Sequence, residues 1–251
     1  MILLQALAFI LDGQNWVSGP RILYQLGVTL SISAISVLIV VVIATPIGIA
    51  IGHTGRGRGV AILLSNVTRA LPTLGLLSIL IVLIGVNATP VAIVLVLLGI
   101  PPMLAGVYAG IESVNRSTID AARAMGMTEG QIIGRVEIPL AAPLIVGGLR
   151  ATTLQIVATT TVASAFAFGG FGLYLIKGLN TADYVQMAAG AILVTALCLL
   201  IDGLLAVVQR LVAPRGVPRD GADSASPKPR ARASRSRATA TVSPLQEGMQ
   251  S

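Results

Sequence analysis

The sequence predicts an all-α membrane protein, a polytopic bundle of about five helical spans at roughly 20 residues each. Hydrophobic residue types make up 55% of the 251 residues, and the mean hydropathy is +0.88. Charged side chains make up only 11%, whereas an average soluble domain has about 25%. So little charge excludes a soluble enzyme and a wholly disordered chain. The single cysteine, Cys198, excludes a disulfide scaffold.

The first 21 residues are expected to form an N-terminal segment at the membrane interface. Their apolar part ends at Leu11, and the polar residues 12–15 follow. This stretch is too short for a span, which needs about 20 residues. It also lacks the basic leader region of a cleaved signal peptide.

The transmembrane domain is expected over residues 22–213. Residues 70–111 contain no charged side chain. They are too many for one helix, and the turn signal Asn-Ala-Thr-Pro at 87–90 divides them. A basic loop at 53–59 and a Gly-rich break at 168–172 supply further boundaries. The five spans are predicted at about 28–52, 60–86, 88–110, 140–165 and 185–209.

The basic residues predict the orientation of the bundle, because cytoplasmic loops carry an excess of Lys and Arg. If loop 53–59, segment 112–139 and the C-terminal tail are cytoplasmic, nearly all basic residues lie inside, and Arg21 and Lys177 lie outside. We therefore expect a multi-pass protein of the cell membrane, with its N-terminus outside and its C-terminus in the cytoplasm.

Residues 214–251 are expected to form a disordered, basic cytoplasmic tail. They carry +4 of the net charge of +7 and are rich in Pro, Ser, Ala and Arg, a composition that cannot bury a core. Attraction to anionic lipid headgroups is worth about 1 kcal/mol per basic residue. We expect membrane lipids and no nucleic acid as partners. A membrane anchor whose tail binds nucleic acid is an alternative interpretation.

The sequence contains no pattern for catalysis or for metal or cofactor binding. The only lysines, Lys177 and Lys228, do not close a nucleotide-binding G-x-x-x-x-G-K-[ST] loop. One histidine, His53, and one cysteine cannot form a metal cluster by themselves. We expect no catalytic residue, no metal and no cofactor on this chain, and a plain interfacial role for His53.

Three ionisable residues fall inside the predicted spans, namely Arg69, Arg150 and Asp202. Charges are costly there and are often functional. Asp202 is close enough to a span end to reach water or a nearby Arg. Arg150 can snorkel or pair with an acid of the cytoplasmic segment. We expect structural or gating roles for all three.

The polar segment 112–139 contains the clearest helix start and stop signals. Ser117-x-x-Asp120 resembles a capping box and predicts a first short helix, which Gly126 ends in a left-handed turn. Thr128-x-x-Gln131 predicts a second helix, and Pro139 is expected to end it. Ala121 and Ala122 leave a bare face that suits close docking of another protein. An ordinary amphipathic interfacial helix is the alternative.

The same segment resembles the EAA loop of ABC importer permeases, through Asp120-Ala-Ala, Gly126 and Ile138-Pro139, with Asp120 in place of the usual Glu. Residues 69–77, 135–143, 147–153 and 168–172 resemble the permeases of osmoprotectant importers, the glycine betaine/carnitine/choline group. The resemblance implies a type I importer fold. It also implies that the loop contacts an ATPase through Asp120, Ala121, Ala122, Gly126, Thr128 and Glu129.

The resemblance further implies a set of partners: cytoplasmic ATP-binding subunits that carry ATP and Mg²⁺, a second permease subunit, identical or different, and an extracytoplasmic solute-binding protein. Aromatic residues make up only 4%, which argues against an aromatic cage for quaternary ammonium ions on this chain. The alternatives are a permease for amino acids such as methionine or another small solute, and a secondary transporter or channel without an ATPase.

Overall fold

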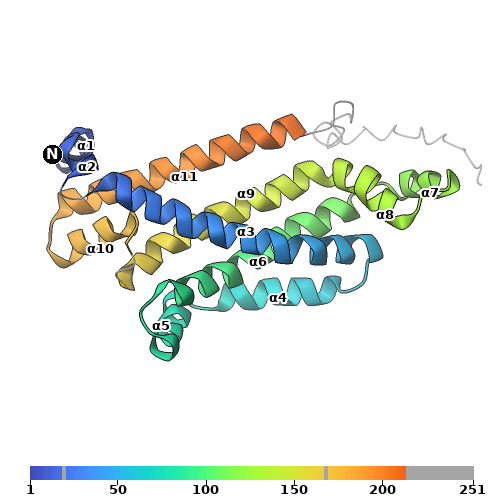
Figure 1. Ribbon diagram of the computed structural model, residues 1–251, viewed down its shortest axis with the longest axis horizontal. Coiled ribbons are helices and arrows are strands. Elements are labelled where there is room, and N and C mark those ends of the chain that lie inside the picture. The colour runs from blue at the N-terminus through green and yellow to red at the C-terminus, as the bar shows by residue number, and fades with distance from the viewer. Residues whose placement is uncertain (19–20, 167–168, 213–251) are drawn as a thin grey trace, which may run out of the picture. The chain divides into compact units, whose positions relative to one another are not determined.

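The computed structural model describes residues 1–18, 21–166 and 169–212, and within these ranges it contains helices and no strand (Figure 1). The all-α bundle is therefore confirmed. The predicted tail, 214–251, lies outside the described residues. Four helical segments are long and apolar enough to cross a membrane: α3 (Ile22–Thr54), α6 (Ala88–Glu112), the run Glu129–Ala163 that ends in α9 (Ile138–Ala163), and α11 (Tyr184–Val212).

The predicted continuous span at 60–86 is wrong, because the chain breaks in its middle. Helix α4 (Arg58–Ala70) and helix α5 (Thr73–Ile84) meet at a bend of 85°. Pro72 causes the break, since a proline pushes the residue before it out of the helical region. Leu71 accordingly has ψ 125° and Pro72 has ψ 113°. The bundle thus has four continuous spans, or five when the bent pair α4–α5 is counted as one span.

The short helices lie at the two ends of the bundle (Figure 1). At one end are α1 (Ile2–Leu11), α2 (Gln14–Val17) and α10 (Gly172–Asn180), and α1 packs against α11. At the other end are α7 (Arg116–Ala124) and α8 (Glu129–Ile132). The start of α3 and the end of α11 lie at opposite ends of the bundle (Figure 1). This placement requires an odd number of crossings, and the four continuous spans give one when the bent pair α4–α5 is counted as a single further crossing.

Helix α6 forms the core, because it packs against both α3 and α9. Small residues allow the close approach: a Cβ added at Gly48 would lie 2.7 Å from the Val107 Cβ, and one added at Gly106 would overlap the backbone of Gly148. Membrane helices associate through such contacts, since lipid tails are as apolar as the helices themselves. The largest fully buried apolar side chains of this core are Val40, Leu77, Val91, Val94, Leu95, Val107 and Ile156.

The described part of the Gly-rich break, residues 169–172, is held by buried side chains of α3. The Gln25 Oε1 accepts from the Gly170 backbone N–H at 2.6 Å, and the Thr29 Oγ1 accepts from the Phe171 N–H at 3.0 Å. Gly169 and Gly170 have φ of +83° and +85°, a region that side chains with a Cβ avoid. Phe168 lies outside the described residues. The motif therefore has a structural role in turning the chain from α9 to α10.

Replacing Gly106 with alanine is expected to destabilise the protein, because the added methyl group meets the backbone of Gly148 and not a flexible side chain. Overpacking of this kind costs about 1–3 kcal/mol. Thermal unfolding of the assembled transporter in detergent would show a lowered midpoint. Gly203→Ala on α11 is the matched control, since its Cβ meets nothing within 4 Å. Equal midpoints for the two variants would contradict the close α6–α9 contact.

Candidate functional site

The polar segment folds as two short helices that begin at polar caps. Asn115 caps α7, and its side chain accepts from the Ser117 N–H at 3.0 Å. The expected capping box of Ser117 and Asp120 is therefore wrong. The cap lies two residues earlier, at Asn115, so the helix begins at Arg116, and Asp120 forms a 3.4 Å ion pair with Arg123 instead. Asparagine is as good a cap as serine, so the local pattern allowed either start.

The turn between α7 and α8 confirms two predictions. Gly126 has φ +83°, the left-handed conformation expected of the residue that ends a helix. Thr128 and Gln131 form a capping box, in which the Gln131 N–H donates to the Thr128 Oγ1 and the Thr128 N–H donates to the Gln131 Oε1. These two devices fix the angle between the short helices.

Pro139 does not end the second helix, contrary to expectation. The chain runs as one helical segment from Glu129 to Ala163, with a π-helical turn at Ile133–Glu137. There the Ile138 N–H bonds to the Ile133 carbonyl, five residues back. This wider turn directly precedes Pro139, which has no backbone N–H to continue the regular helical hydrogen-bond pattern. The predicted loop is thus joined rigidly to the fourth span.

Most of the predicted contact residues lie at the surface of this end of the bundle. Asp120, Ala121, Gly126, Thr128 and Glu129 are exposed. Ala122 is only 2% exposed and packs in a small core of its own. The expected bare face is therefore reduced to Ala121 and its exposed neighbours. The core beneath it is formed by Val114, Ile119, Ala122 and Ile132.

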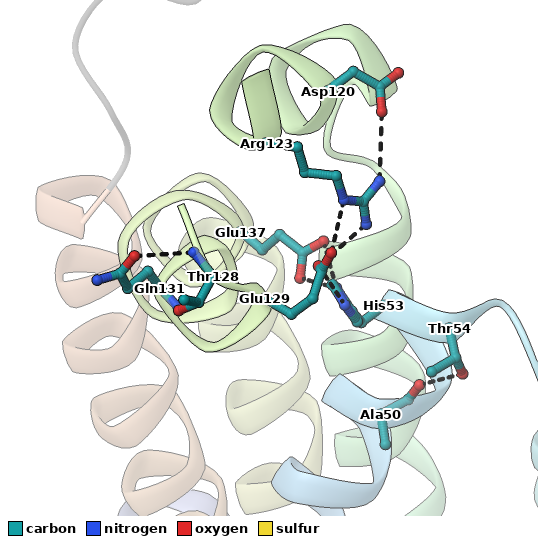
Figure 2. Close-up of polar contacts among 9 residues, drawn as sticks. All are labelled: Ala50, His53, Thr54, Asp120, Arg123, Thr128, Glu129, Gln131 and Glu137. Carbon is teal, nitrogen blue, oxygen red and sulfur yellow. Dashed lines mark hydrogen bonds and ion pairs between the residues drawn. The ribbon is translucent and has the colours of Figure 1, made fainter. Parts of the chain in front are cut away.

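A chain of ionic contacts lies under this surface and reaches helix α3 (Figure 2). Arg123 binds the Glu129 carboxylate with two nitrogens, at 2.8 and 3.1 Å. This carboxylate raises the pKa of the Arg123 guanidinium, which therefore keeps its charge. The Glu129 Oε2, which accepts from the Arg123 Nη2, also lies 3.2 Å from the Nε2 of His53.

His53 sits between two carboxylates. Its Nδ1 is 2.9 Å from both carboxylate oxygens of Glu137, and its Nε2 faces Glu129. Each ring nitrogen therefore has a carboxylate partner, one from Glu137 and one from Glu129. The side chains of Glu137 and His53 are 2% and 15% exposed. The plain interfacial role expected of His53 is therefore wrong, because the ring joins α3 to the π-helical turn and to α8.

The sequence contained a weak signal for this contact. His53 ends the first apolar stretch, and Glu137 lies between Val136 and Ile138 next to the fourth. An acid among apolar residues needs a partner when it is buried. The sequence could not identify that partner, because the two residues are 84 positions apart.

The predicted intramembrane charges Arg150 and Asp202 are paired with each other. The Arg150 Nη2 donates to the Asp202 Oδ2 at 2.6 Å, and the Nε donates to the other oxygen. The pair joins α9 to α11. The expected partner for Arg150, an acid of the cytoplasmic segment, is wrong, whereas a nearby Arg for Asp202 is confirmed. Arg69 lies on α4, and its side chain is outside the described residues.

Replacing Glu137 with glutamine is expected to destabilise the protein strongly, because His53 then faces a buried amide in place of a buried charge. Breaking one partner of a buried ion pair costs about 3–5 kcal/mol. Glu112→Gln is the control, since Glu112 pairs with Arg58 at 2.8 Å but both side chains are exposed, and such pairs are worth about 0–1 kcal/mol. Thermal unfolding of the two variants compares the effects. A Glu137→Gln midpoint no lower than that of the control would contradict the role of this pair.

The chain is similar to known transport proteins over most of its length. It is 36% identical to the glycine betaine/carnitine/choline transport system permease protein OpuCB of Bacillus subtilis, over 80% of this chain and 92% of that protein. It is 35% identical to the choline transport system permease protein OpuBB of the same organism, over 80% and 93%. A solved structure of the methionine ABC transporter MetNI, in an inward-facing conformation, matches with a TM-score of 0.68 and 23% identity, over 79% of this chain and 100% of that one. That likeness concerns the fold.

Residues 44–214 match the family described as binding-protein-dependent transport system inner membrane component. This range contains the bent pair α4–α5, the short helices α7 and α8, the His53–Glu137 contact and the Arg150–Asp202 pair. The type I importer fold implied by the sequence is confirmed by the helical bundle and its structural neighbour. The chain belongs to the family of inner-membrane permease components of binding-protein-dependent ABC importers.

Proposed function

We propose that this chain forms the membrane pathway for a small osmoprotectant, such as glycine betaine, choline or carnitine. The observation that carries the substrate class is the 36% identity, over 80% of this chain, to a permease whose name states those three solutes. Membership of a binding-protein-dependent family favours an ATP-driven importer over a secondary transporter. ATP would be hydrolysed by separate subunits, and a binding protein would deliver the solute.

Uptake measurements test the substrate class. A strain without this protein, and without other osmoprotectant systems, is expected to lose uptake of radiolabelled glycine betaine, choline or carnitine at high osmolarity. Complementation with the wild-type chain should restore the uptake. Unchanged uptake after deletion would contradict the substrate class, and the family assignment would stand without it.

The ATP-binding partner would dock on the surface formed by α7, the Gly126 turn and the start of α8. Three features support this contact. The residues Asp120, Ala121, Gly126, Thr128 and Glu129 are exposed at one end of the bundle. Met125 beside them is 76% exposed and adds an apolar side chain to this polar surface. The capping devices hold both short helices at a fixed angle.

The ionic contacts beneath this surface would carry motion from the docking surface to the spans. The Arg123–Glu129 pair links α7 to α8, and His53 links α8 and the π-helical turn to α3 (Figure 2). The segment Glu129–Ala163 is one helical run, so a displacement of α8 reaches α9 directly. Two of the three core helices would therefore respond to a partner that moves the short helices.

The same end of the bundle would face the cytoplasm, with the N-terminus outside and the C-terminus inside. The distribution of basic residues supports this orientation. Arg21 and Lys177 belong to the opposite end, near the start of α3 and on α10. The basic side chains at or near the α7 end are Arg56, Arg58, Arg116, Arg123, Arg135 and Arg210.

Gly126 provides a test of the docking surface. A Cβ at this position meets nothing within 4 Å, so a substitution acts through the backbone conformation. A left-handed conformation costs an ordinary residue about 1–2 kcal/mol, while asparagine tolerates it. Gly126→Val is expected to lower solute uptake and recovery of the ATPase with the purified permease several-fold, and Gly126→Asn is expected to retain most of both. Gly130→Ala, in α8 and equally open, is the control. Equal uptake by the valine and asparagine variants would contradict a conformational role.

A further inference from the structure

A cavity of about 480 Å³ lies between the broken span and helices α6 and α9. Thr68 and Thr73 come from either side of the break, Pro101 and Pro102 from α6, and Ala151 and Gln155 from α9. The volume falls within the range of about 300–1,000 Å³ that small-molecule sites occupy. Three of these six side chains carry a hydroxyl or an amide, although the helices that supply them are strongly apolar.

Interruptions in two helices meet at this cavity. The broken span turns through 85° at Leu71 and Pro72. On α6, Pro101 and Pro102 have no backbone N–H, so the carbonyls of Leu97 and Leu98 receive no helical hydrogen bond from them. Leu98 itself lines the cavity. Irregular or unbonded backbone at membrane depth is tolerated where it lines a cavity that holds water or solute. Broken apolar helices mark binding sites in other transporters for the same reason.

The position of Gln155 points to the same use. This residue lies well inside α9 (Ile138–Ala163), and its side chain is exposed in this chain. Its Nε2 is 3.4 Å from the Thr159 Oγ1 of its own helix. A polar amide at this depth is costly against lipid, and such residues usually face the bundle interior or a water-filled space. Gln155 therefore fits the wall of an aqueous path better than a lipid-facing surface.

The chemistry of the lining restricts the ligand. No described lining residue is charged or aromatic. The cavity therefore offers neither an ion partner for a net charge nor a cation–π cage for a quaternary ammonium group. A lining of hydroxyl, amide and apolar side chains suits a small solute with no net charge, including a zwitterion. Binding without ionic contacts is weak, as release along a transport path requires.

We infer that this cavity is a transient binding site for a small net-neutral polar or zwitterionic solute on the transport path, and that it ranks a zwitterion above a cation of similar size. The inference rests on the proposed function, since it assigns a site within that pathway. It identifies Thr73 and Gln155 as the residues that determine the preference, and Ala151 as the residue whose small size keeps the cavity open.

Filling the cavity provides the first test. Ala151→Phe is expected to lower the maximal rate of glycine betaine uptake at least tenfold in vesicles that contain the whole transporter and its binding protein. Ala158→Phe is the matched control, because Ala158 is exposed on the same helix, seven positions further on, and does not line the cavity. ATP hydrolysis and subunit recovery, measured on the same preparations, report assembly.

The second test removes polar groups without changing size much. Thr73→Val and Gln155→Leu are expected to lower the ratio of glycine betaine uptake to choline uptake at least threefold. Thr195→Val is the control, since its hydroxyl bonds to Ala191 within α11. A merely structural role would scale both rates together and leave the ratio unchanged. An assembled Ala151→Phe transporter with wild-type uptake, or unchanged ratios in both polar variants, would overturn the inference. A wild-type transporter that takes up neither solute would instead overturn the proposed function.

Discussion

Helices inside a bilayer gain little by hiding apolar side chains from lipid tails, so α6 holds its neighbours through the close approach of small residues. Gly48 and Gly52 of α3 face Val107 and Ile111, and Gly106 lies against Gly148 of α9. Because α3 and α9 both pack on α6, these contacts fix the position of α3 along the bundle relative to α9. The alignment of their ends in turn brings His53 to Glu137, so the ionic contacts at the α7 end depend on glycine contacts farther along the spans.

Charged residues are few, and some of them join helices of the bundle. Arg150 and Asp202 tie α9 to α11, and His53 ties α3 to the segment that starts α9. Glu137 is buried, and a buried charge without a partner costs several kcal/mol, whereas Arg150 and Asp202 are partly exposed. Each of these pairs therefore allows only a narrow set of helix arrangements. Such a restriction suits a transporter that changes between a small number of conformations while its helices stay packed together.

Prolines act differently according to their position, and the differences shape the candidate path. Pro46 and Pro143 lie inside continuous helices, and Pro139 follows a π-helical turn. Pro72 instead breaks a span, and Pro101 and Pro102 remove helical bonds beside the same cavity. A proline close to a helix start loses little, because the first N–H groups are unbonded in any case. One in the middle of a span leaves a backbone acceptor without its helical partner, and Leu98, which loses its bond to Pro102, lines the cavity.

The sequence by itself determined the all-α membrane class, four of the five spans, the left-handed turn at Gly126 and the capping box of Thr128 and Gln131. All of these follow from composition or from residues a few positions apart, where apolar runs, caps and glycine act directly on the local backbone. Only the tertiary structure decided the 85° break at Pro72, the burial of Ala122, the pairing of Arg150 with Asp202 and the position of His53 between two carboxylates. The physical reason is that these side-chain contacts are set by helix packing: His53 and Glu137, for example, are 84 positions apart, and no local pattern encodes such a pairing. Pro72 marks where the chain can bend, but the size of the bend depends on how the two helices pack.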